Sequence, residues 1–295
     1  MLTIMGATGH TGGRIARALL QAGEPVRAIG RSASKLAELK RAAAETAAGE
    51  AADAGFLANA FRGSDAVYTL IPPDPRTADY RATQDALGEA IISAIQASGV
   101  RYVVFLSSLG GEVPAGTGPI AGLHAQEERL RQLSNVHALV LRPAYFFENF
   151  YETLGLIKEQ GINGGAIAGD LVMPMISTKD IAEVAAEALR QRSWTGHAVR
   201  ELLGERDLSH TEASRILGRL IDRPDLQYVQ FPYADYTAAL VRAGLSPSVA
   251  NLYTELARAL NDGTVTAREE RRAGNTTPTR FEEFATELAA AYYAL

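Results

Sequence analysis

The chain has 295 residues, of which 47% are hydrophobic and 21% charged, a balance typical of a globular protein with a sizeable core. Its net charge of −5 and the lack of a long basic stretch argue against direct binding to nucleic acid. Because the chain has no cysteine, it can form no disulfide and offers no thiolate for catalysis or metal binding.

The sequence also gives no sign of a membrane or metal partner. No basic flank precedes an apolar stretch at the start of the chain, and no run reaches the about 18 apolar residues that a membrane span needs. We therefore expect a cytoplasmic protein without a signal peptide. The five histidines show no metal-ligand spacing, so we expect no metal site.

Strands and helices alternate through the first half of the chain. The apolar stretch 2–5, a helix over 12–22 and a strand over 25–31 form one βαβ unit. Further strands are predicted at 45–49, 64–73, 101–108 and 137–143, and further helices at 34–44, 56–61, 77–98 and 124–134. This alternation predicts an α/β protein in which residues 1–150 form a Rossmann domain, a doubly wound, mostly parallel sheet covered on both faces.

After residue 150 the pattern becomes mainly helical, with a few short strands. Helices are predicted at 180–189, 209–221, 233–261 and 279–294. Ser209 with Glu212 forms a capping box at the start of one of them. The stretch 268–272, "REERR", is interpreted as a solvated helix face. Residues 151–295 are therefore predicted to form a smaller lobe, with some segments returning to the sheet.

The stretch "IMGATGHTGG" at 4–13 joins the first strand to the first helix. Gly6 would allow the sharp turn, Gly9 the close approach of a diphosphate, and Gly12 the packing of helix on strand. The helix N-terminus would add unpaired N–H groups and partial positive charge. Side chains that could donate further hydrogen bonds are Thr8, His10 and Thr11. The alternative is a tight turn that binds no ligand.

The end of the second strand predicts which dinucleotide binds. An NAD site usually has a carboxylate there for the ribose 2′-hydroxyl, but this chain reads "AIGRSASK". Arg31 and Lys35 could instead hold a 2′-phosphate, which an acid would repel. We therefore predict NADP(H) as the cofactor, with NAD(H) the less favoured choice. The alternative interpretation of Arg31 is a solvated loop residue.

Several segments together resemble the NmrA-like branch of the atypical short-chain dehydrogenase/reductase superfamily. They are "GATGHTGG", "GRSASKL", "VVFLSS", "LRPAYFFENF" and "TPTRFEEFATELA", which span nearly the whole chain. The resemblance implies a Rossmann domain, a small C-terminal lobe and an NADP(H) site. Within the branch the chain is most similar to NADPH-dependent reductases of quinones and triphenylmethane dyes. Other members are regulators that sense the redox state of the dinucleotide and catalyse nothing.

The Tyr-x-x-x-Lys pair of typical short-chain dehydrogenases is missing. The stretch "GPIAGLHAQEERL" should carry it, yet no tyrosine or lysine occurs between residues 103 and 144. Ile120 stands where the tyrosine would be, and His124 stands near the lysine position. His124 is the best candidate for a polar group that contacts substrate or the nicotinamide ribose. The alternative is a structural histidine at a helix start.

Residues that follow the other strands are expected to complete the site, because ligands bind at the carboxyl edge of such a sheet. The expected cofactor contacts are Leu70, Ile71, Pro72, Ser107 and Ser108, together with the backbone of Pro143 and Ala144 beside the carboxamide. Tyr145 and Phe147 are expected to form walls of the substrate pocket. The alternatives are that the serines cap a loop and that the aromatic rings pack in the core.

Two functions from different classes remain open from the sequence. The first is NADPH-dependent reduction of a small, planar, electron-poor molecule such as a quinone or dye, which needs little proton help. The second is a non-catalytic module that binds NADP(H) and reports its redox state to a partner protein. A reductase or isomerase of aromatic metabolites such as lignans is a weaker reading, because no lysine lies near residue 124. A monomer and a homodimer are both compatible with the sequence.

Overall fold

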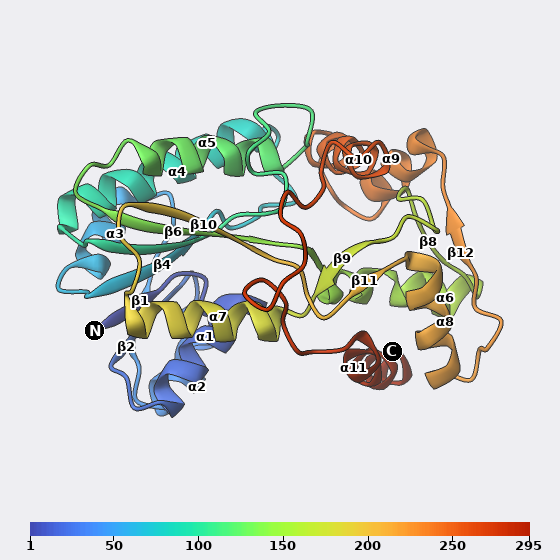
Figure 1. Cartoon of the computed structure of the whole chain (residues 1–295), viewed down its shortest axis with the longest axis horizontal. Helices are drawn as coiled ribbons and strands as arrows, with labels where there is room; N and C mark the ends of the chain where they lie inside the picture. Colours follow the sequence, from blue (N-terminus) through green and yellow to red (C-terminus); the bar gives the residue numbers. More distant parts are fainter.

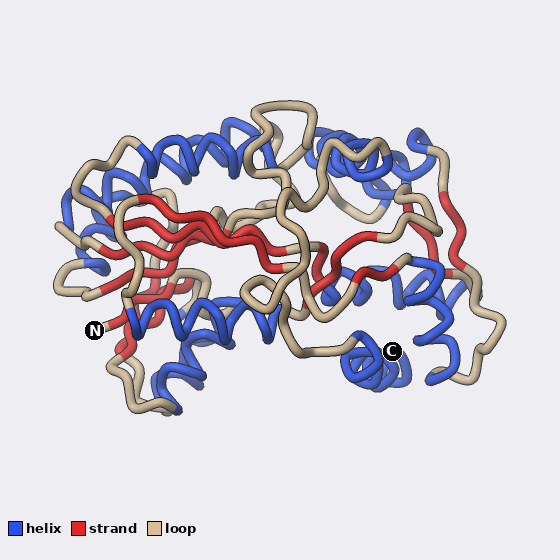
Figure 2. The backbone as a smooth tube through the Cα atoms, in the orientation of Figure 1, coloured by secondary structure: helices blue, strands red, loops and turns tan.

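The computed structural model describes residues 1–295 and centres on one seven-stranded sheet (Figures 1 and 2). Its strands are β1 (Leu2–Ile4), β2 (Val26–Gly30), β3 (Glu45–Ala48), β4 (Ala66–Leu70), β5 (Tyr102–Leu106), β6 (His137–Pro143) and β10 (His197–Leu202). They pair in the order β10-β6-β5-β4-β1-β2-β3, and every pairing is parallel. The order reverses between β1 and β4, and ligands bind beside such a switch point.

Helices cover both faces of this sheet, as parallel strands joined by crossover helices require. One face carries α3 (Ala54–Phe61), α4 (Tyr80–Ser98) and α5 (Ile120–Arg131); the other carries α1 (His10–Gln21), α2 (Ala33–Arg41) and α7 (Thr178–Gln191) (Figure 1). The predicted Rossmann-type architecture is therefore confirmed. No helix is both long enough and apolar enough to span a membrane.

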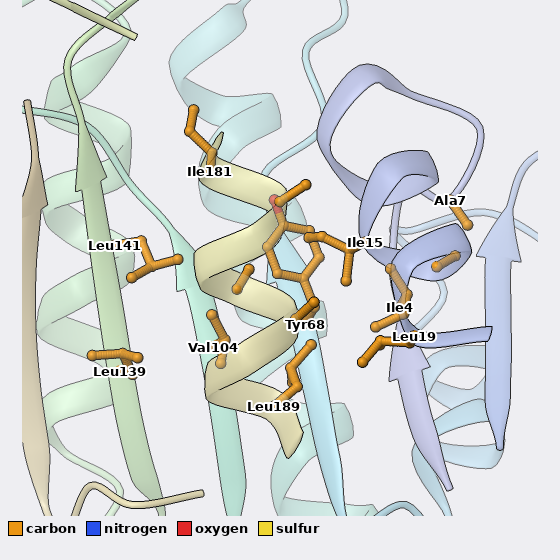
Figure 3. Packing of buried hydrophobic residues seen from close by; sticks show 14 of the residues in the cluster. Ile4, Ala7, Ile15, Leu19, Tyr68, Val104, Leu139, Leu141, Ile181 and Leu189 are labelled. Carbon is orange, nitrogen blue, oxygen red and sulfur yellow. The ribbon is translucent and has the colours of Figure 1, made fainter. Parts of the chain in front are cut away.

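The packing between the sheet and α7 shows how the layers hold together. Figure 3 shows Ile181 and Leu189 of α7 over the strands that carry Tyr68 and Val104. All four side chains are buried in one hydrophobic cluster. Complete burial of an aliphatic side chain stabilises the fold by about 1.5–3 kcal/mol, so this layer anchors α7 although it lies in the second half of the chain.

A second lobe lies beyond the carboxyl ends of the strands (Figure 1). It contains β7 (Tyr145–Phe146), the 3-10 helix η1 (Phe147–Thr153), α6 (Leu154–Gln160), β8 (Asn163–Gly165), β9 (Met173–Ile176), β11 (Asp207–Leu208), α8 (His210–Leu220), β12 (Tyr228–Gln230), α9 (Tyr233–Arg242), α10 (Pro247–Asn261) and α11 (Phe281–Ala294). It has its own buried cluster, in which Phe147, Phe281 and Phe284 pack against one another.

Element boundaries in this half differ from the predicted ones where turn residues interrupt a helical pattern. The predicted helix over 233–261 is two helices, because Gly244 adopts φ +99° and Pro247 starts α10. The Oγ of Ser209 accepts the N–H of Glu212 at 3.1 Å, which is one half of the predicted capping box, while the Glu212 carboxylate accepts from Arg206 instead. The stretch 268–272 is not helical; it belongs to a loop, residues 262–280, that crosses from α10 to α11 (Figure 2).

Candidate functional site

A cleft lined by residues of the sheet and of the second lobe lies at the carboxyl ends of the central strands. Its volume is about 790 Å³, within the range of about 300–1,000 Å³ common for ligand sites. One end is lined by the turn between β1 and α1, and the other by side chains from η1, α9 and α10. Both lobes therefore contribute to one continuous site.

The three glycines of the first turn differ in what surrounds them. Gly6 has φ +62°, a left-handed conformation that favours glycine. A Cβ on Gly12 would lie 2.4 Å from the Gly6 carbonyl oxygen, so the contact between helix and turn excludes any side chain. Gly9 has extended backbone, and a Cβ there would meet only the Gly6 oxygen, at 3.4 Å. Neither strain nor packing demands glycine at position 9, which lines the cleft.

The start of α1 offers backbone donors to the cleft. Gly9 is the N-cap and no side chain caps the helix, so no side-chain acceptor competes for the first N–H groups. The first turn contains no acidic residue that would oppose a bound anion. Thr8, His10 and Thr11 also line the cleft, and the Thr11 Oγ1 accepts the Tyr68 hydroxyl at 3.1 Å. This end of the cleft therefore suits an anionic group such as a diphosphate.

Cationic side chains flank the anion-suited end. Arg31 lines the cleft at the end of β2, and Lys35 lines an adjoining hollow together with Arg17 and Glu38. Arg31 and Lys35 are exposed, and neither forms an ion pair within the chain. Thr8 and Gly9 border both spaces. An additional phosphate near the turn would thus meet positive charge.

The middle of the cleft lies over β4 and β5. Leu70, Ile71 and Pro72 line it after β4, and Ser107 and Ser108 line it after β5. The Ser107 hydroxyl cannot donate to a ligand in this arrangement, because it already donates a 2.5 Å hydrogen bond to Glu127.

The glutamate that accepts from Ser107 belongs to a buried ion pair. Arg142 of β6 binds both carboxylate oxygens of Glu127 of α5, at 3.1 and 2.6 Å. Removing one partner of such a pair leaves an uncompensated buried charge, which costs about 3–5 kcal/mol. The pair therefore holds α5, β6 and the end of β5 in a fixed relation beneath the cleft.

The same network fastens the crossing loop 262–280 over the cleft. Glu112 accepts from Arg142 at 2.9 Å and from Arg268 at 2.6 Å. The buried Glu201 carboxylate accepts the backbone N–H groups of Arg268 and Glu269. The charged stretch 268–272, interpreted from sequence as a solvated helix face, is instead tied to the sheet. As a result Val265, Thr266 and Ala267 line the cleft.

Pro143 and Ala144 line the cleft, but part of their backbone is already used. The Pro143 carbonyl accepts the Leu109 N–H at 3.1 Å, and the Ala144 N–H donates to the Leu202 carbonyl at 2.9 Å. A ligand could therefore use only the second lone pair of the Pro143 oxygen and the Ala144 atoms other than its N–H.

The first turns of α5 hold the positions that would carry a Tyr–Lys pair. Pro119, Ile120 and Leu123 line the cleft with apolar side chains. His124 lies outside the cleft lining, and its Nδ1–H donates to the Gly111 carbonyl at 2.9 Å. This hydrogen bond orients the imidazole of His124, and the apolar Ile120 occupies the position of the missing tyrosine.

Of the two aromatic residues expected in the substrate pocket, the structure brings only one to the cleft. Tyr145 lines it, whereas Phe147 is 1% exposed in the core of the second lobe, 5.1 Å from Phe281 between ring centroids. Phe146, the intervening residue, lines the cleft instead. Phe147 is the first residue of η1, so the turn from β7 into this helix, rather than composition, decides which ring points into the core.

The lobe end of the cleft contains polar residues that the sequence had not singled out. They are Asn149, Glu152, Tyr236 and Tyr253. Asn149 follows Tyr145 by four residues and Glu152 follows Asn149 by three, so helical periodicity in and after "RPAYFFEN" was a usable signal. Tyr236 and Tyr253 come from α9 and α10, and no local pattern connects them to the strands.

Burial shifts the pKa values of several of these groups. It raises the pKa of Tyr236 to about 12 and raises that of Tyr145 further, so both phenols stay neutral. It also raises the pKa of Glu152 above its usual range. Behind Tyr145, His210 packs at 5.2 Å between ring centroids, and burial lowers its pKa to about 4.

The glycine turn, the uncapped helix start and the flanking cations, at the switch point of a doubly wound sheet, define a dinucleotide-binding α/β protein. The chain belongs to the NmrA-like family, whose model matches residues 1–285. This confirms the family that the sequence motifs resemble.

Similar proteins cover nearly the whole chain. The NAD(P)H azoreductase of Xenophilus azovorans is 28% identical over 265 residues, which are 87% of this chain and 86% of that protein. The NADPH-dependent quinone oxidoreductase of Escherichia coli, solved with NADPH, gives a TM-score of 0.82 at 22% identity, with 98% and 99% of the two chains covered. The triphenylmethane reductase of Citrobacter sp., solved with NADP(H), gives 0.82 at 20% identity, with 98% and 100% covered.

Proposed function

We propose that the protein is an NADPH-dependent reductase of planar, electron-poor compounds such as quinones and dyes. The observation that carries this proposal is the continuity of the cleft, which runs from the glycine turn into a half lined by aromatic and aliphatic side chains of the second lobe. The similar proteins are named an azoreductase, a quinone oxidoreductase and a triphenylmethane reductase, which supports the same class of acceptor.

The residues present fit a phosphorylated dinucleotide. Gly9 and the start of α1 would hold the diphosphate, and Arg31 with Lys35 would hold the 2′-phosphate. Hydrophobic Leu70 and Ile71 would contact the adenosine side. When bound, the reduced nicotinamide supplies a hydride, which carries two electrons.

The chain's own contribution to the reaction is then binding and orientation. Tyr145 and Phe146 present ring surfaces on which a flat acceptor can stack beside the end of β6. Gly263, Val265, Thr266 and Ala267 of the loop 262–280 also line the cleft. Holding two reactants in contact is worth up to about 7–11 kcal/mol of barrier, so positioning can supply much of the acceleration without a Tyr–Lys pair.

The test is a panel of acceptors with the purified protein. Quinones, azo dyes and cationic triphenylmethane dyes are each mixed with NADPH, and the absorbance of NADPH is followed with and without the acceptor. We expect acceptor-dependent oxidation with at least one planar class, and faster oxidation of NADPH than of NADH. A protein that binds NADPH but oxidises it with none of these acceptors would contradict the proposal.

A redox-sensing module is the second candidate, because α5 offers neither tyrosine nor lysine to the cleft. A sensor must bind NADP⁺ and NADPH with different affinities or respond to them with different conformations. Calorimetry with each form, together with hydrogen exchange, measures both properties. Equal affinities and identical exchange patterns would exclude this function, and acceptor turnover would favour the reductase.

A further inference from the structure

The lobe half of the cleft contains one carboxyl group that forms no ion pair, and it lies among phenols and apolar side chains. It belongs to Glu152 in the last turn of η1, and Tyr145, Tyr236 and Tyr253 line the same space. Glu152 forms no ion pair and remains accessible to solvent in the open cleft. A side chain placed in this way can touch a bound acceptor and can exchange protons with water.

No other acid is available in this half of the cleft. Among the titratable lining residues, His10 and Arg31 lie at the glycine turn, and Asp207 is paired with Arg271. The phenols are too weakly acidic, since burial raises the pKa of Tyr80 well above its usual range as it does for the others. Ser107 and Ser108 carry hydroxyls that do not ionise near neutral pH.

The proposed acceptors differ in whether they need a proton. A quinone or an azo compound that receives a hydride becomes an anion at oxygen or nitrogen, and a proton must follow. A cationic triphenylmethane dye receives the hydride at its central carbon and becomes neutral, so no proton is required. An acid in the cleft therefore matters for the first two classes and not for the third.

We propose that Glu152 is the proton donor for quinone and azo acceptors in this cleft, an inference that rests on the proposed reductase function. The O–H bond of the Glu152 carboxyl breaks, and a new O–H or N–H bond forms on the acceptor. The two electrons arrive with the hydride from NADPH. The Glu152 carboxylate then regains a proton from water that reaches the cleft.

The surroundings of Glu152 favour its protonated form. The ionisable groups that face it are Tyr145 from β7, Tyr236 from α9 and Tyr253 from α10, and all three stay neutral. No cation faces it, and desolvation by the surrounding protein raises the pKa of its carboxyl. Such a shift moves an acid toward the working pH, where general acids are most effective.

Substitution by an isosteric amide separates proton donation from contact. Glu152→Gln keeps the shape of the side chain but cannot release a proton. We expect its kcat with a quinone to fall about 100-fold, in line with a lost general acid, while its kcat with a cationic triphenylmethane dye stays within twofold. The matched control is Glu159→Gln in α6, an exposed glutamate outside the cleft, which should leave both rates unchanged.

The pH profile gives a second readout. For the wild type, kcat with the quinone should fall as pH rises through the Glu152 pKa, because only the protonated carboxyl donates. The profile of Glu152→Gln should lose this step, and Glu152→Asp should restore it with a lower rate. Loss of the dye rate with an intact quinone rate in Glu152→Gln would show that Glu152 attracts cations as a carboxylate, and would overturn the proposal.

A measurement without turnover completes the test. Carbon NMR of the free protein labelled at the glutamate side-chain carboxyls identifies the Glu152 resonance by its loss in Glu152→Gln. We expect its titration midpoint to lie above those of the glutamates outside the cleft, and an ordinary midpoint would overturn the proposal. A wild type that reduces no acceptor refutes the reductase function itself; a wild type that reduces quinones as well as Glu152→Gln does refutes only the role of Glu152.

Discussion

Two single substitutions to alanine in the first turn, at Gly9 and at Gly12, should affect different properties: the first ligand binding, the second stability. Gly9→Ala adds a methyl group at a position with extended backbone, where the nearest atom is the Gly6 oxygen at 3.4 Å. Gly12→Ala adds the same methyl group 2.4 Å from that oxygen and 2.7 Å from two further backbone atoms. The two substituted positions are three residues apart, and both variants carry the same chemical change.

The expected magnitudes follow from these contacts. Alanine at a helix N-cap costs about 0.5–1 kcal/mol relative to glycine, and the loss of unfolded-state entropy returns a similar amount, so Gly9→Ala should be nearly neutral. Gly12→Ala gains up to about 1 kcal/mol of helix propensity. That gain is outweighed because backbone atoms cannot rotate aside, and overpacking costs about 1–3 kcal/mol or more. We expect a net loss of about 2 kcal/mol and a Tm lower by about 4 °C.

Thermal unfolding without ligand and calorimetric titration with NADPH measure the two effects separately. Gly9→Ala should keep its Tm and weaken NADPH binding at least tenfold, because the methyl group occupies space beside the expected diphosphate. Gly12→Ala should lower Tm. If Gly9→Ala binds NADPH with the wild-type Kd, no ligand approaches this backbone; if Gly12→Ala is as stable as the wild type, the packing argument is wrong.

Three further predictions concern charge. Arg31→Ala should raise the Kd for NADPH about tenfold and leave the Kd for NADH unchanged, as measured by calorimetry with each cofactor. Equal effects on the two Kd values would contradict a contact between Arg31 and the 2′-phosphate. Glu127→Gln should lower the free energy of unfolding, measured in urea, by about 3 kcal/mol, whereas the same substitution at the partly exposed Glu128 should change it by less than about 1 kcal/mol. Equal effects would argue against the buried pair of Glu127 with Arg142. Because burial lowers the pKa of His210 from 6.5 to about 4, the unfolding free energy should fall by about 3 kcal/mol as pH drops across that window, and His210→Phe should lose this dependence; a slope kept in the variant would assign it elsewhere.

The strands of the first half of the fold could be predicted because the local sequence pattern of each matches its surroundings in the folded protein. The strand predicted over 137–143 is β6, His137–Pro143, and the weak alanine-rich strand at 45–49 is β3, Glu45–Ala48. A buried strand such as β6 has a short apolar run bounded by turn residues, so no knowledge of its neighbours is needed, whereas β3 is a partly exposed edge strand with a weaker pattern. The glycine turn was readable for the same reason, since its constraints arise within ten residues.

The candidate site was only partly readable, because its far half is assembled from segments distant in sequence. Tyr236 and Tyr253 reach the cleft through the packing of α9 and α10, which no periodicity reports. Phe146 and Phe147 are neighbouring residues of the same type, so the sequence does not distinguish them. The turn into η1 places Phe147 in the core and Phe146 in the cleft.

The sequence by itself determined the βαβ start, the parallel sheet, the family and the cationic end of the second strand. These features depend on residue type and short-range spacing. Only the tertiary structure decided that His124 bonds to a neighbouring carbonyl, that the charged stretch 268–272 is fastened across the cleft, and that Glu152 stands alone among phenols. Each depends on which segments meet after the second lobe packs on the sheet, and hydrogen bonding and desolvation act on groups only once they are in contact.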